Sequence, residues 1–571
     1  MNKEKIVLFV VIAFSLLLRI NFEITYQDLY VDKMIQISEA KNLMIGNGLT
    51  NSAINSNDFT RISSNYVNKY APGYSLFIIP FHFITGDYHL AANIMDIFFV
   101  VLLFLALILL LNCLNIPPKK QILLFAFLGI SFTPFYHLSS TDLISMTFFQ
   151  WAIYFTVRYL KDKAGYIRIS VLTGFLLYLT GFIKYNYYPL MFSVPLAVFI
   201  IGYFNKEKQV KLFSVICGGV AMILLLLQSI ILKMFSGSMF TIVDETGIFF
   251  KNLLSMDVFP FKSFFFYEGL LTNLFVSRPY METIYILIAA AFSLLVIIET
   301  IRFIFKKNIG NESTPKNMIF ENQHCPDPKG RLIFCDFPLG IKGKKSQNKE
   351  NGAFRSGLDN KIIKNYLILG LTVLIINVMF LSFMSLTHKA QAWQTPPWTS
   401  VEETRYYSQS MLFIEIIFLT FILFGQYKTK FQKIIYKSVV LIVFAYAGLY
   451  WLNNFYNIYV KKDTRYTYNG MYKENIQITD AVKANTEKDK FTVFSSPDPL
   501  MNQFVLIFTD IKAINNNYAA LMNDTVVKTD KPVILFIASP GNEKDLKNLK
   551  KYAPVKIAGF EAYDLYKTEI K

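Results

Sequence analysis

The sequence predicts a polytopic α-helical membrane protein of about 11 transmembrane helices, with a small extracytoplasmic α/β domain at its C-terminal end. Of the 571 residues 53% are hydrophobic, and the mean hydropathy is +0.37. Apolar runs of about twenty residues recur along the chain, each long enough to cross about 30 Å of hydrocarbon. The net charge of +17 is concentrated in alternate connectors, so we attribute it to membrane topology rather than to a nucleic-acid partner.

The apolar runs and the basic connectors alternate in a consistent order. Following that order from Lys3 and Lys5, the N-terminus and the connectors PPKK, RYLKDK, NKEKQVK, 306–363 and YKTKFQKIIYK are cytoplasmic, as the positive-inside rule requires. The high Lys, Asn and Phe content is typical of an AT-rich bacterial genome, which places the chain in a bacterial plasma (inner) membrane. The spans expected are roughly 6–23, 89–112, 120–137, 142–159, 168–184, 187–204, 211–233, 283–305, 364–386, 408–426 and 433–452.

This topology divides the chain into a transmembrane domain, residues 1–455, and an extracytoplasmic domain, 456–571. In the second, FTVFSS, KPVILFIAS and VKIAGFEAYDLYK have the composition of strands. Two further segments are expected outside: the long loop 24–88, and the aromatic-rich segment 235–281, which has the character of an amphipathic element at the interface. The basic cytoplasmic linker 306–363 is typical of a solvated segment.

The loop 24–88 is the first candidate for a functional site, because connections between membrane helices are usually short. In a helix starting near Asp28, that residue and Asp32 lie one turn apart on the same face, and Gly46 provides a natural stop. The turn from Lys69 to Tyr74 then returns the chain to the same membrane face. The alternative is that both acids only solvate an external helix.

Four further charged residues stand at the outer ends of predicted spans. Asp142 precedes the fourth span, where it caps the helix, serves a functional role, or does both. Lys184 closes the fifth span, Arg278 opens the eighth, and Arg405 lies in VEETRYYSQSMLF. Such cations either extend along the interface or bind an anionic ligand outside, for example a lipid phosphate.

Taken in order, these motifs resemble the GT-C superfamily of glycosyltransferases, which includes the protein O-mannosyltransferases and the lipid A aminoarabinose transferases. The resemblance extends over roughly residues 1–460. Two features depart from the family pattern: Lys33 follows Asp32 where the family often has Asp-Glu, and Gln36 stands where an aromatic is usual. Asp28 is therefore the alternative counterpart of Asp32. The matching positions are Asp32, Ala40, Gly46, Gly48, Ala71-Pro72-Gly73-Tyr74, Thr141-Asp142, Gly181 to Pro189 with Lys184 in place of an arginine, and Arg405-Tyr406.

The resemblance implies an inverting glycosyltransferase that moves a sugar from a polyprenyl-phosphate donor to a lipid, glycan or protein on the external face. It implies that Asp32 or Asp28 is the general base, and that Asp142 orients the acceptor or helps to bind a divalent metal such as Mg or Mn. The residues it implies for binding substrate or lipid phosphate are Lys184, Arg278, Arg405, Tyr406, Lys69 and Tyr74.

Two other functions remain open at this point. A transporter or lipid flippase of the envelope predicts charged or broken helices near the bilayer midplane and repeated halves, and the sequence has neither feature. A scaffold that displays the C-terminal domain leaves the long first loop without a purpose.

Overall fold

The computed structural model describes most of the N-terminal half and the C-terminal segment. The described residues are 3–26, 31–54, 59, 63–66, 70–130, 141–236, 360–387, 472–487, 490–515, 517–523, 527–529, 531–541 and 547–570, with scattered positions between 294 and 461.

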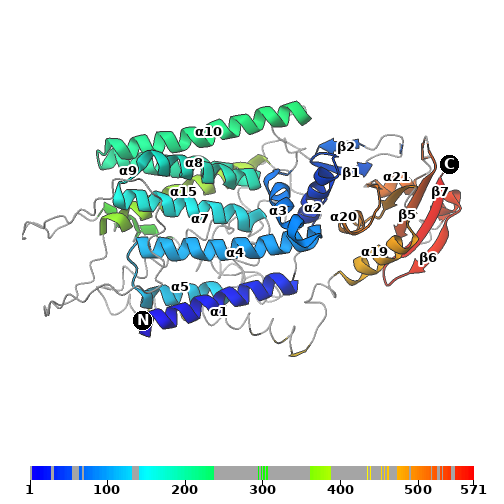
Figure 1. The fold of residues 1–571 in the computed structure, drawn as a ribbon, viewed down its shortest axis with the longest axis horizontal. Coiled ribbons are helices and arrows are strands. Elements are labelled where there is room, and N and C mark those ends of the chain that lie inside the picture. The colour runs from blue at the N-terminus through cyan, green and yellow to red at the C-terminus, as the bar shows by residue number, and fades with distance from the viewer. Residues whose placement is uncertain are drawn as a thin grey trace, which may run out of the picture.

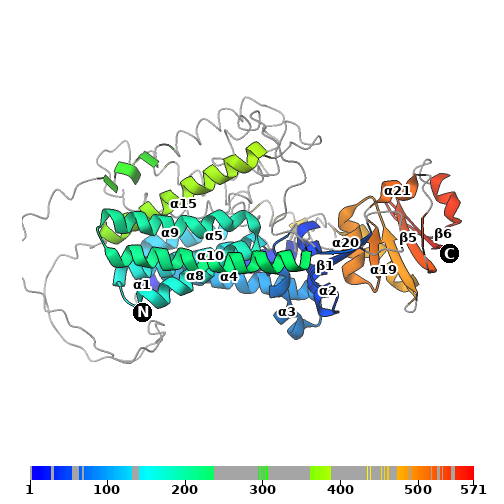
Figure 2. The same ribbon diagram turned by 90° about the horizontal axis from the view of Figure 1, so that it is seen from above.

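Long helices run side by side in a bundle, and a β-sheet lies beyond one end of it (Figures 1 and 2). Within the bundle α7 packs between α4 and α8, α10 packs on α8 and α9, α1 packs on α5, and α15 packs on α9. The bundle helices are α1 (Lys3–Tyr26), α4 (Tyr88–Cys113), α5 (Pro118–Ile130), α7 (Thr141–Asp162), α8 (Tyr166–Ile183), α9 (Tyr188–Phe204), α10 (Lys208–Ser236) and α15 (Asn360–Thr387).

Small residues and short polar contacts join these helices. A Cβ added to Gly174 of α8 would lie 2.5 Å from the carbonyl oxygen of Cys217 in α10, so the two backbones meet where no side chain intervenes. Trp151 of α7 donates from Nε1 to the carbonyl oxygen of Leu102 in α4 at 3.2 Å. Apolar packing with occasional interhelical hydrogen bonds is the pattern expected where lipid surrounds the helices.

Three helices in the described part of the chain are long and apolar enough to cross a membrane: Tyr88–Cys113, Tyr166–Ile183 and Lys208–Met234. The polytopic membrane class is therefore confirmed, whereas the count of about 11 helices stays a prediction. Helices also occupy the predicted spans 6–23, 120–137, 142–159, 187–204 and 364–386, although α5 is described only to Ile130. The remaining predicted segments lie almost wholly outside the described residues. They are the spans 408–426 and 433–452, most of 283–305, and the segments 235–281 and 306–363.

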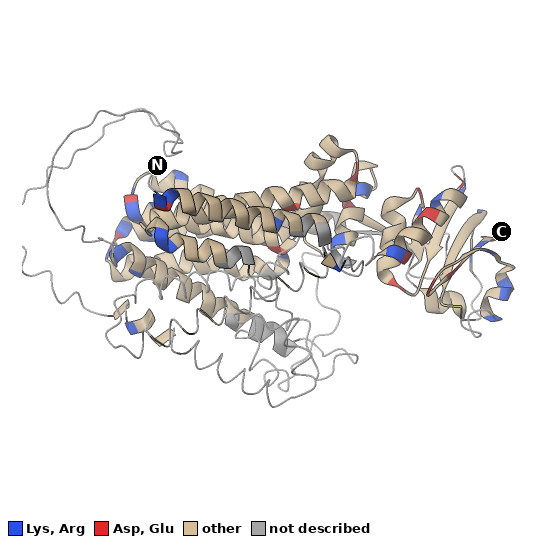
Figure 3. Ribbon diagram, turned by 90° about the horizontal axis from the view of Figure 1, so that it is seen from below, with Lys and Arg blue, Asp and Glu red and all other residues tan. Residues whose placement is uncertain are grey.

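The described parts of the predicted cytoplasmic connectors meet at the end of the bundle that carries the N-terminus. Lys161 donates to the carbonyl oxygen of Cys113 at 2.8 Å, and Glu207 pairs with both Lys163 and Lys361. In Figure 3 charged residues gather at this end and in the region of the sheet, with mostly uncharged helix surface between them. The described parts of these connectors therefore share one end, while the place of 427–437 and the side of the membrane that this end faces stay predictions.

The first loop, 24–88, is more structured than the sequence indicated. The predicted helix exists as α2 (Val31–Met44), and the chain turns at Gly46, where φ is +86°. Two short strands follow, β1 (Thr50–Ile54) and β2 (Ser63–Tyr66). A further helix, α3 (Gly73–Thr85), was not predicted; it ends at Gly86, where φ is +71°, and packs against α4.

The sheet contains seven strands in the order β2-β1-β4-β3-β5-β7-β6. Strands β1, β4, β3 and β5 are parallel, and the three others pair antiparallel at the two edges. The three tail segments predicted as strands are strands, but the sheet also takes in β1 and β2 from the first loop. The tail strands are β3 (Phe491–Ser495), β4 (Ala513–Asn515), β5 (Val533–Ser539), β6 (Val555–Gly559) and β7 (Asp564–Ile570).

Helices cover both faces of this sheet. On one face α19 (Lys473–Asn485) and α20 (Pro499–Phe508) pack on alternate residues of β5, and on the other lie α21 (Tyr518–Met522) and the short η7 (Lys550–Tyr552). Every residue of β5 is buried, which explains its continuous apolar run.

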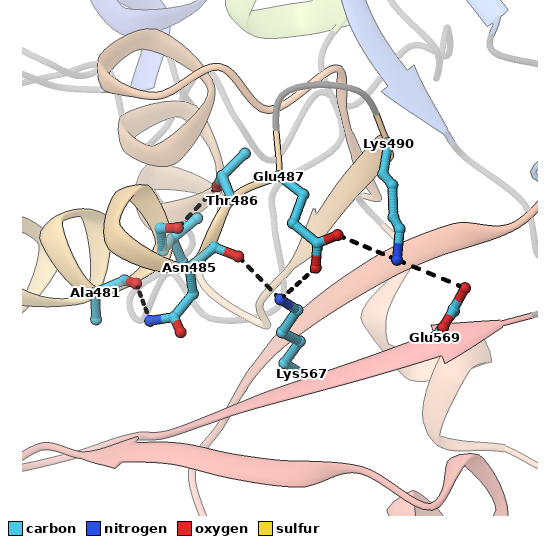
Figure 4. Close-up of polar contacts among 8 residues, drawn as sticks. Ala481, Asn485, Thr486, Glu487, Lys490, Lys567 and Glu569 are labelled. Atoms are coloured by element: carbon cyan, nitrogen blue, oxygen red, sulfur yellow. Dashed lines mark hydrogen bonds and ion pairs between the residues drawn. The ribbon is translucent and has the colours of Figure 1, made fainter.

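Surface ion pairs tie the end of α19 to strand β7, which lies between β5 and the edge strand β6 (Figure 4). Lys567 donates at 3.0 Å both to the carbonyl oxygen of Asn485 and to Glu487, and Lys490 lies between Glu487 and Glu569. The hydrogen bonds from Lys567 and Lys490 lower the pKa of Glu487. Because Glu487 is exposed, this cluster orders the surface more than it stabilises the fold.

We expect Gly73→Ala to destabilise the protein by about 1–3 kcal/mol, the usual cost of overpacking. A Cβ at Gly73 would lie 2.6 Å from the carbonyl oxygen of Phe182 and 2.8 Å from Ile183, so α3 would have to move away from α8. Thermal unfolding in detergent measures the effect.

Gly219→Ala is the matched control, because nothing lies within 4 Å of a Cβ at that helical position. Its melting temperature should equal or slightly exceed that of the wild type. Equal melting temperatures for the two variants would contradict the close contact between α3 and α8.

Candidate functional site

Asp142 and Lys184, two of the residues singled out in the sequence, form a buried ion pair. The Nζ of Lys184 lies 2.8 and 2.7 Å from the two carboxylate oxygens of Asp142, and the hydroxyl of Tyr187 donates to Oδ1 at 2.9 Å. The side chain of Asp142 is 1% exposed and that of Lys184 is 17% exposed. The pair is therefore closed on the Asp142 side and partly open on the Lys184 side.

The break between α8 and α9 brings this pair together. α8 ends at Ile183, Lys184 is extended (φ −150°, ψ 120°), and a 3₁₀ turn, η1 (Tyr185–Tyr187), leads into α9. This break directs Lys184 and Tyr187 toward the first turn of α7, where Asp142 lies. The carboxylate of Asp142 thus joins α7 to the break between α8 and α9. The sequence analysis interpreted Asp142 as a helix cap, a functional acid or both, and did not predict this contact.

The described residues around Asp142 do not by themselves fit a divalent metal. Lys184 occupies both carboxylate oxygens, and a bound cation would have to displace this ammonium. Among the described residues no group of three His, Cys, Asp or Glu side chains is placed to hold a metal ion, whereas a resident Mg²⁺ or Mn²⁺ prefers several oxygen ligands.

A second buried ion pair joins α2 to α4. The Nζ of Lys33 lies 2.8 Å from a carboxylate oxygen of Asp96 and 3.3 Å from Oδ1 of Asn93. The hydroxyl of Tyr74 lies 3.4 Å from both oxygens of Asp96. Lys33 is 1% exposed and Asp96 is not exposed at all, so each charge depends on the other for its compensation.

Sequence reasoning missed this second pair. Lys33 was noted only as a departure from the family pattern, and Asp96 was passed over as part of the predicted span 89–112. A detectable signal was present, because an acid inside an apolar membrane helix is costly and requires a partner. The structure shows that this partner of Asp96 is Lys33, the lysine beside Asp32.

The first turn of α3 lies between the two ion pairs. Tyr74 contacts Asp96, while Gly73 lies directly against Phe182 and Ile183, the residues that precede Lys184. Motifs more than a hundred residues apart in the sequence therefore meet at one end of the bundle, the end opposite the basic connectors.

The other residues predicted for the site are placed only in part. Asp32 is the second residue of α2, beside Lys33, and only its backbone is described. Asp28, the alternative base, lies outside the described residues, so its position relative to Asp32 stays a prediction. The same holds for Lys69, Arg278, Arg405 and Tyr406.

Glu39 is a further buried acid on α2 that the sequence analysis did not single out. It is 1% exposed; its Oε2 accepts from the hydroxyl of Ser75 in α3 at 2.7 Å, and its Oε1 has no partner within the described part of the chain. Burial raises the pKa of Glu39 to about 8, and the Ser75 hydrogen bond opposes this only in part. The residues Asp32, Gln36 and Glu39 share one helix face by their spacing.

Comparisons with known proteins find similarity at the level of structure only. No protein-family model matches the sequence, and no curated protein does. Two solved structures of ArnT from Cupriavidus metallidurans, one in the apo state and one bound to undecaprenyl phosphate, align over 98% of this chain and 97% of theirs. Both are 9% identical to it, with TM-scores of 0.43 and 0.42. A likeness this distant assigns neither an activity nor a residue role.

We expect Lys33→Met and Asp96→Asn each to destabilise the protein by about 3–5 kcal/mol, because each leaves an uncompensated buried charge. The double variant should recover much of this loss, since no unpaired charge remains. Thermal or denaturant unfolding of the four proteins in detergent measures the coupling.

Lys361→Met is the control, because Lys361 is 66% exposed and pairs with Glu207 at the opposite end of the bundle. It should change stability by less than about 1 kcal/mol. Purely additive effects of the Lys33 and Asp96 substitutions would contradict the ion pair.

The burial of Glu39 predicts a specific pH dependence. A carboxyl whose folded pKa is about 8, against the ordinary 4.5, stabilises the fold fully below the unfolded value. That contribution is lost progressively between pH 4.5 and about 8, because over this range the unfolded chain releases the proton while the folded protein keeps it. Unfolding of wild type and Glu39→Gln between pH 5 and 9 should show the wild type losing stability relative to the variant. Parallel curves would contradict a buried, protonated Glu39.

Proposed function

We propose that this chain is an inverting glycosyltransferase of the GT-C type that uses a polyprenyl-phosphate-linked sugar at the outer face of a bacterial plasma membrane. The observation that carries the proposal is the convergence of α2, the start of α3 and the Asp142–Lys184 pair at one end of an apolar helix bundle. A site at the rim of a membrane bundle suits a donor whose lipid tail lies in the bilayer and whose phosphate and sugar lie at its surface.

The side of the membrane that the site faces restricts which kind of sugar donor it can use. The basic connectors gather at the opposite end of the helices, and such connectors face the cytoplasm by the positive-inside rule. The site then faces outward, where nucleotide-sugars are absent, so the activated sugar must arrive attached to a lipid.

The residue types match the demands of this transfer. The acceptor hydroxyl or amine attacks the anomeric carbon as the bond from that carbon to the phosphate oxygen breaks. The electron pair leaves with the polyprenyl phosphate, and the acceptor proton passes to a carboxylate. A single direct displacement inverts the anomeric centre. A carboxylate is needed as general base and cations are needed near the leaving phosphate.

In this proposal Asp32 is the general base, with Asp28 as the alternative. Lys184, held by Asp142 and partly exposed, stabilises the leaving phosphate, and Arg278 and Arg405 supply further positive charge. Tyr74, Tyr406 and Lys69 are assigned to substrate binding. Asp142 acts by fixing Lys184 and, through that contact, the phosphate.

We expect Asp32→Asn to lower the transfer rate by about 10²–10⁴-fold, the usual cost of removing a general base, and Asp28→Asn to have a smaller effect. Asp142→Asn should weaken transfer by releasing Lys184. The assay uses purified protein in lipid, radiolabelled polyprenyl-phosphate sugars and membrane extract as acceptor.

Asp162→Asn is a matched control for Asp142→Asn, because both residues lie on α7 but Asp162 is half-exposed at the opposite end. It should transfer sugar at the wild-type rate. If Asp28→Asn alone abolishes transfer, the base is Asp28. If the wild type neither binds nor consumes any lipid-linked donor, the transferase proposal is wrong and transport becomes the function to test.

A further inference from the structure

The C-terminal segment docks directly on α2, the helix that carries Asp32. Lys41, in the last turn of α2, donates from Nζ to the carbonyl oxygens of Leu506, Ile507 and Thr509 at 3.0, 3.2 and 2.9 Å. The three ammonium protons of a lysine suffice for three such bonds. One side chain of the first loop therefore binds three backbone groups of the tail.

These carbonyls belong to the end of α20, where the last backbone acceptors of a helix lack intrahelical partners. A cation at that end also interacts favourably with the helix dipole. Burial is the largest influence on Lys41 and lowers its pKa, while the charge of Asp510 opposes the shift. A lysine buried in this way is held by its acceptors, so the contact is specific to the end of α20.

Apolar contacts extend the same interface. Phe504 and Ile507 of α20 belong to the hydrophobic core of the bundle, together with Met34 and Ile37 of α2. The ring of Phe508 meets that of His89 edge-on, with centroids 5.5 Å apart. α20 is thus part of the bundle core as well as of the sheet.

The strand that follows α2 is bound to the tail as well. β1 runs parallel to β4, with Ala53 opposite Ile514 and Ile54 opposite Asn515. Asn42, near the end of α2, donates to the carbonyl oxygen of Thr50 at 2.6 Å and so fixes the turn between helix and strand. Both elements of the segment 31–54 therefore contact the tail.

We propose that the C-terminal segment 472–570 is a positioning element of the transferase site, and that Lys41 is the positioning residue through which it acts. α2 lies between two supports: α20 through Lys41, and the helices α3 and α4 through Glu39–Ser75 and Lys33–Asp96. Removing the first support allows α2 to shift, and with it the backbone of Asp32. This inference rests on the proposed function only where it concerns catalysis; the docking of α2 is independent of it.

The test compares Lys41→Met, Lys41→Arg and the control Lys483→Met, an exposed lysine on α19, all in the full chain. Lys41→Met should lower kcat about 10- to 100-fold, as small misplacements of a catalytic group do, with the KM for the polyprenyl-phosphate sugar nearly unchanged. Lys41→Arg should restore most of kcat, because a guanidinium also presents several donors to carbonyls. Lys483→Met should match the wild type.

Hydrogen exchange of residues 31–44 is the second readout and needs no activity. Exchange should rise in Lys41→Met and return toward the wild-type value in Lys41→Arg. Unchanged exchange and kcat in Lys41→Met would overturn the proposal, as would a change in KM alone. If the wild type transfers no sugar, the proposed function fails, while hydrogen exchange still decides whether Lys41 holds α2. If Lys41→Met does not fold, Lys41→Gln replaces it with the same expected direction.

Discussion

The arrangement of the site depends on one constraint: a charge withdrawn from water must be paired. An unpaired ion costs several kcal/mol in a protein interior or within a membrane. Lys33 and Asp96 come from α2 and α4, and Asp142 and Lys184 come from α7 and the α8–α9 break. Neither pair forms unless these elements meet, so the two pairs select one arrangement of helix ends from the many that apolar packing alone permits.

Sequence reasoning found what depends on local composition. Apolar runs gave the long helices, and β5 was recognised from a continuous apolar stretch. α3 was missed because its 13 residues, interrupted by Pro80, are too short for a span. β1 and β2 were missed because TNSAI and SSNY lack apolar alternation. Asp142 and Lys184 were each singled out, but pairing across 42 positions is a tertiary property that no local pattern encodes.

Charges in this chain serve two different purposes at the two ends of the bundle. At the N-terminal end Lys163 and Lys361 share Glu207 on a partly exposed surface, where ion pairs contribute little to stability. At the other end the charges of the two ion pairs, Lys33–Asp96 and Asp142–Lys184, are largely buried. The buried pairs thus determine how the helix ends are arranged, whereas the exposed pairs contribute little to stability.

α2 shows the effect of buried charges most clearly, because it is a polar helix that is almost wholly buried. A helix with so little apolar character is stable there only if each polar side chain has its own partner. Lys33 meets α4, Glu39 meets α3 and Lys41 meets α20, so three side chains within nine residues fix the helix from three directions. This explains why the loop between the first two spans is long: it must reach both the bundle and the sheet. It also explains why a carboxylate at the start of α2 has a defined backbone position, which a flexible loop would not provide and which a general base requires.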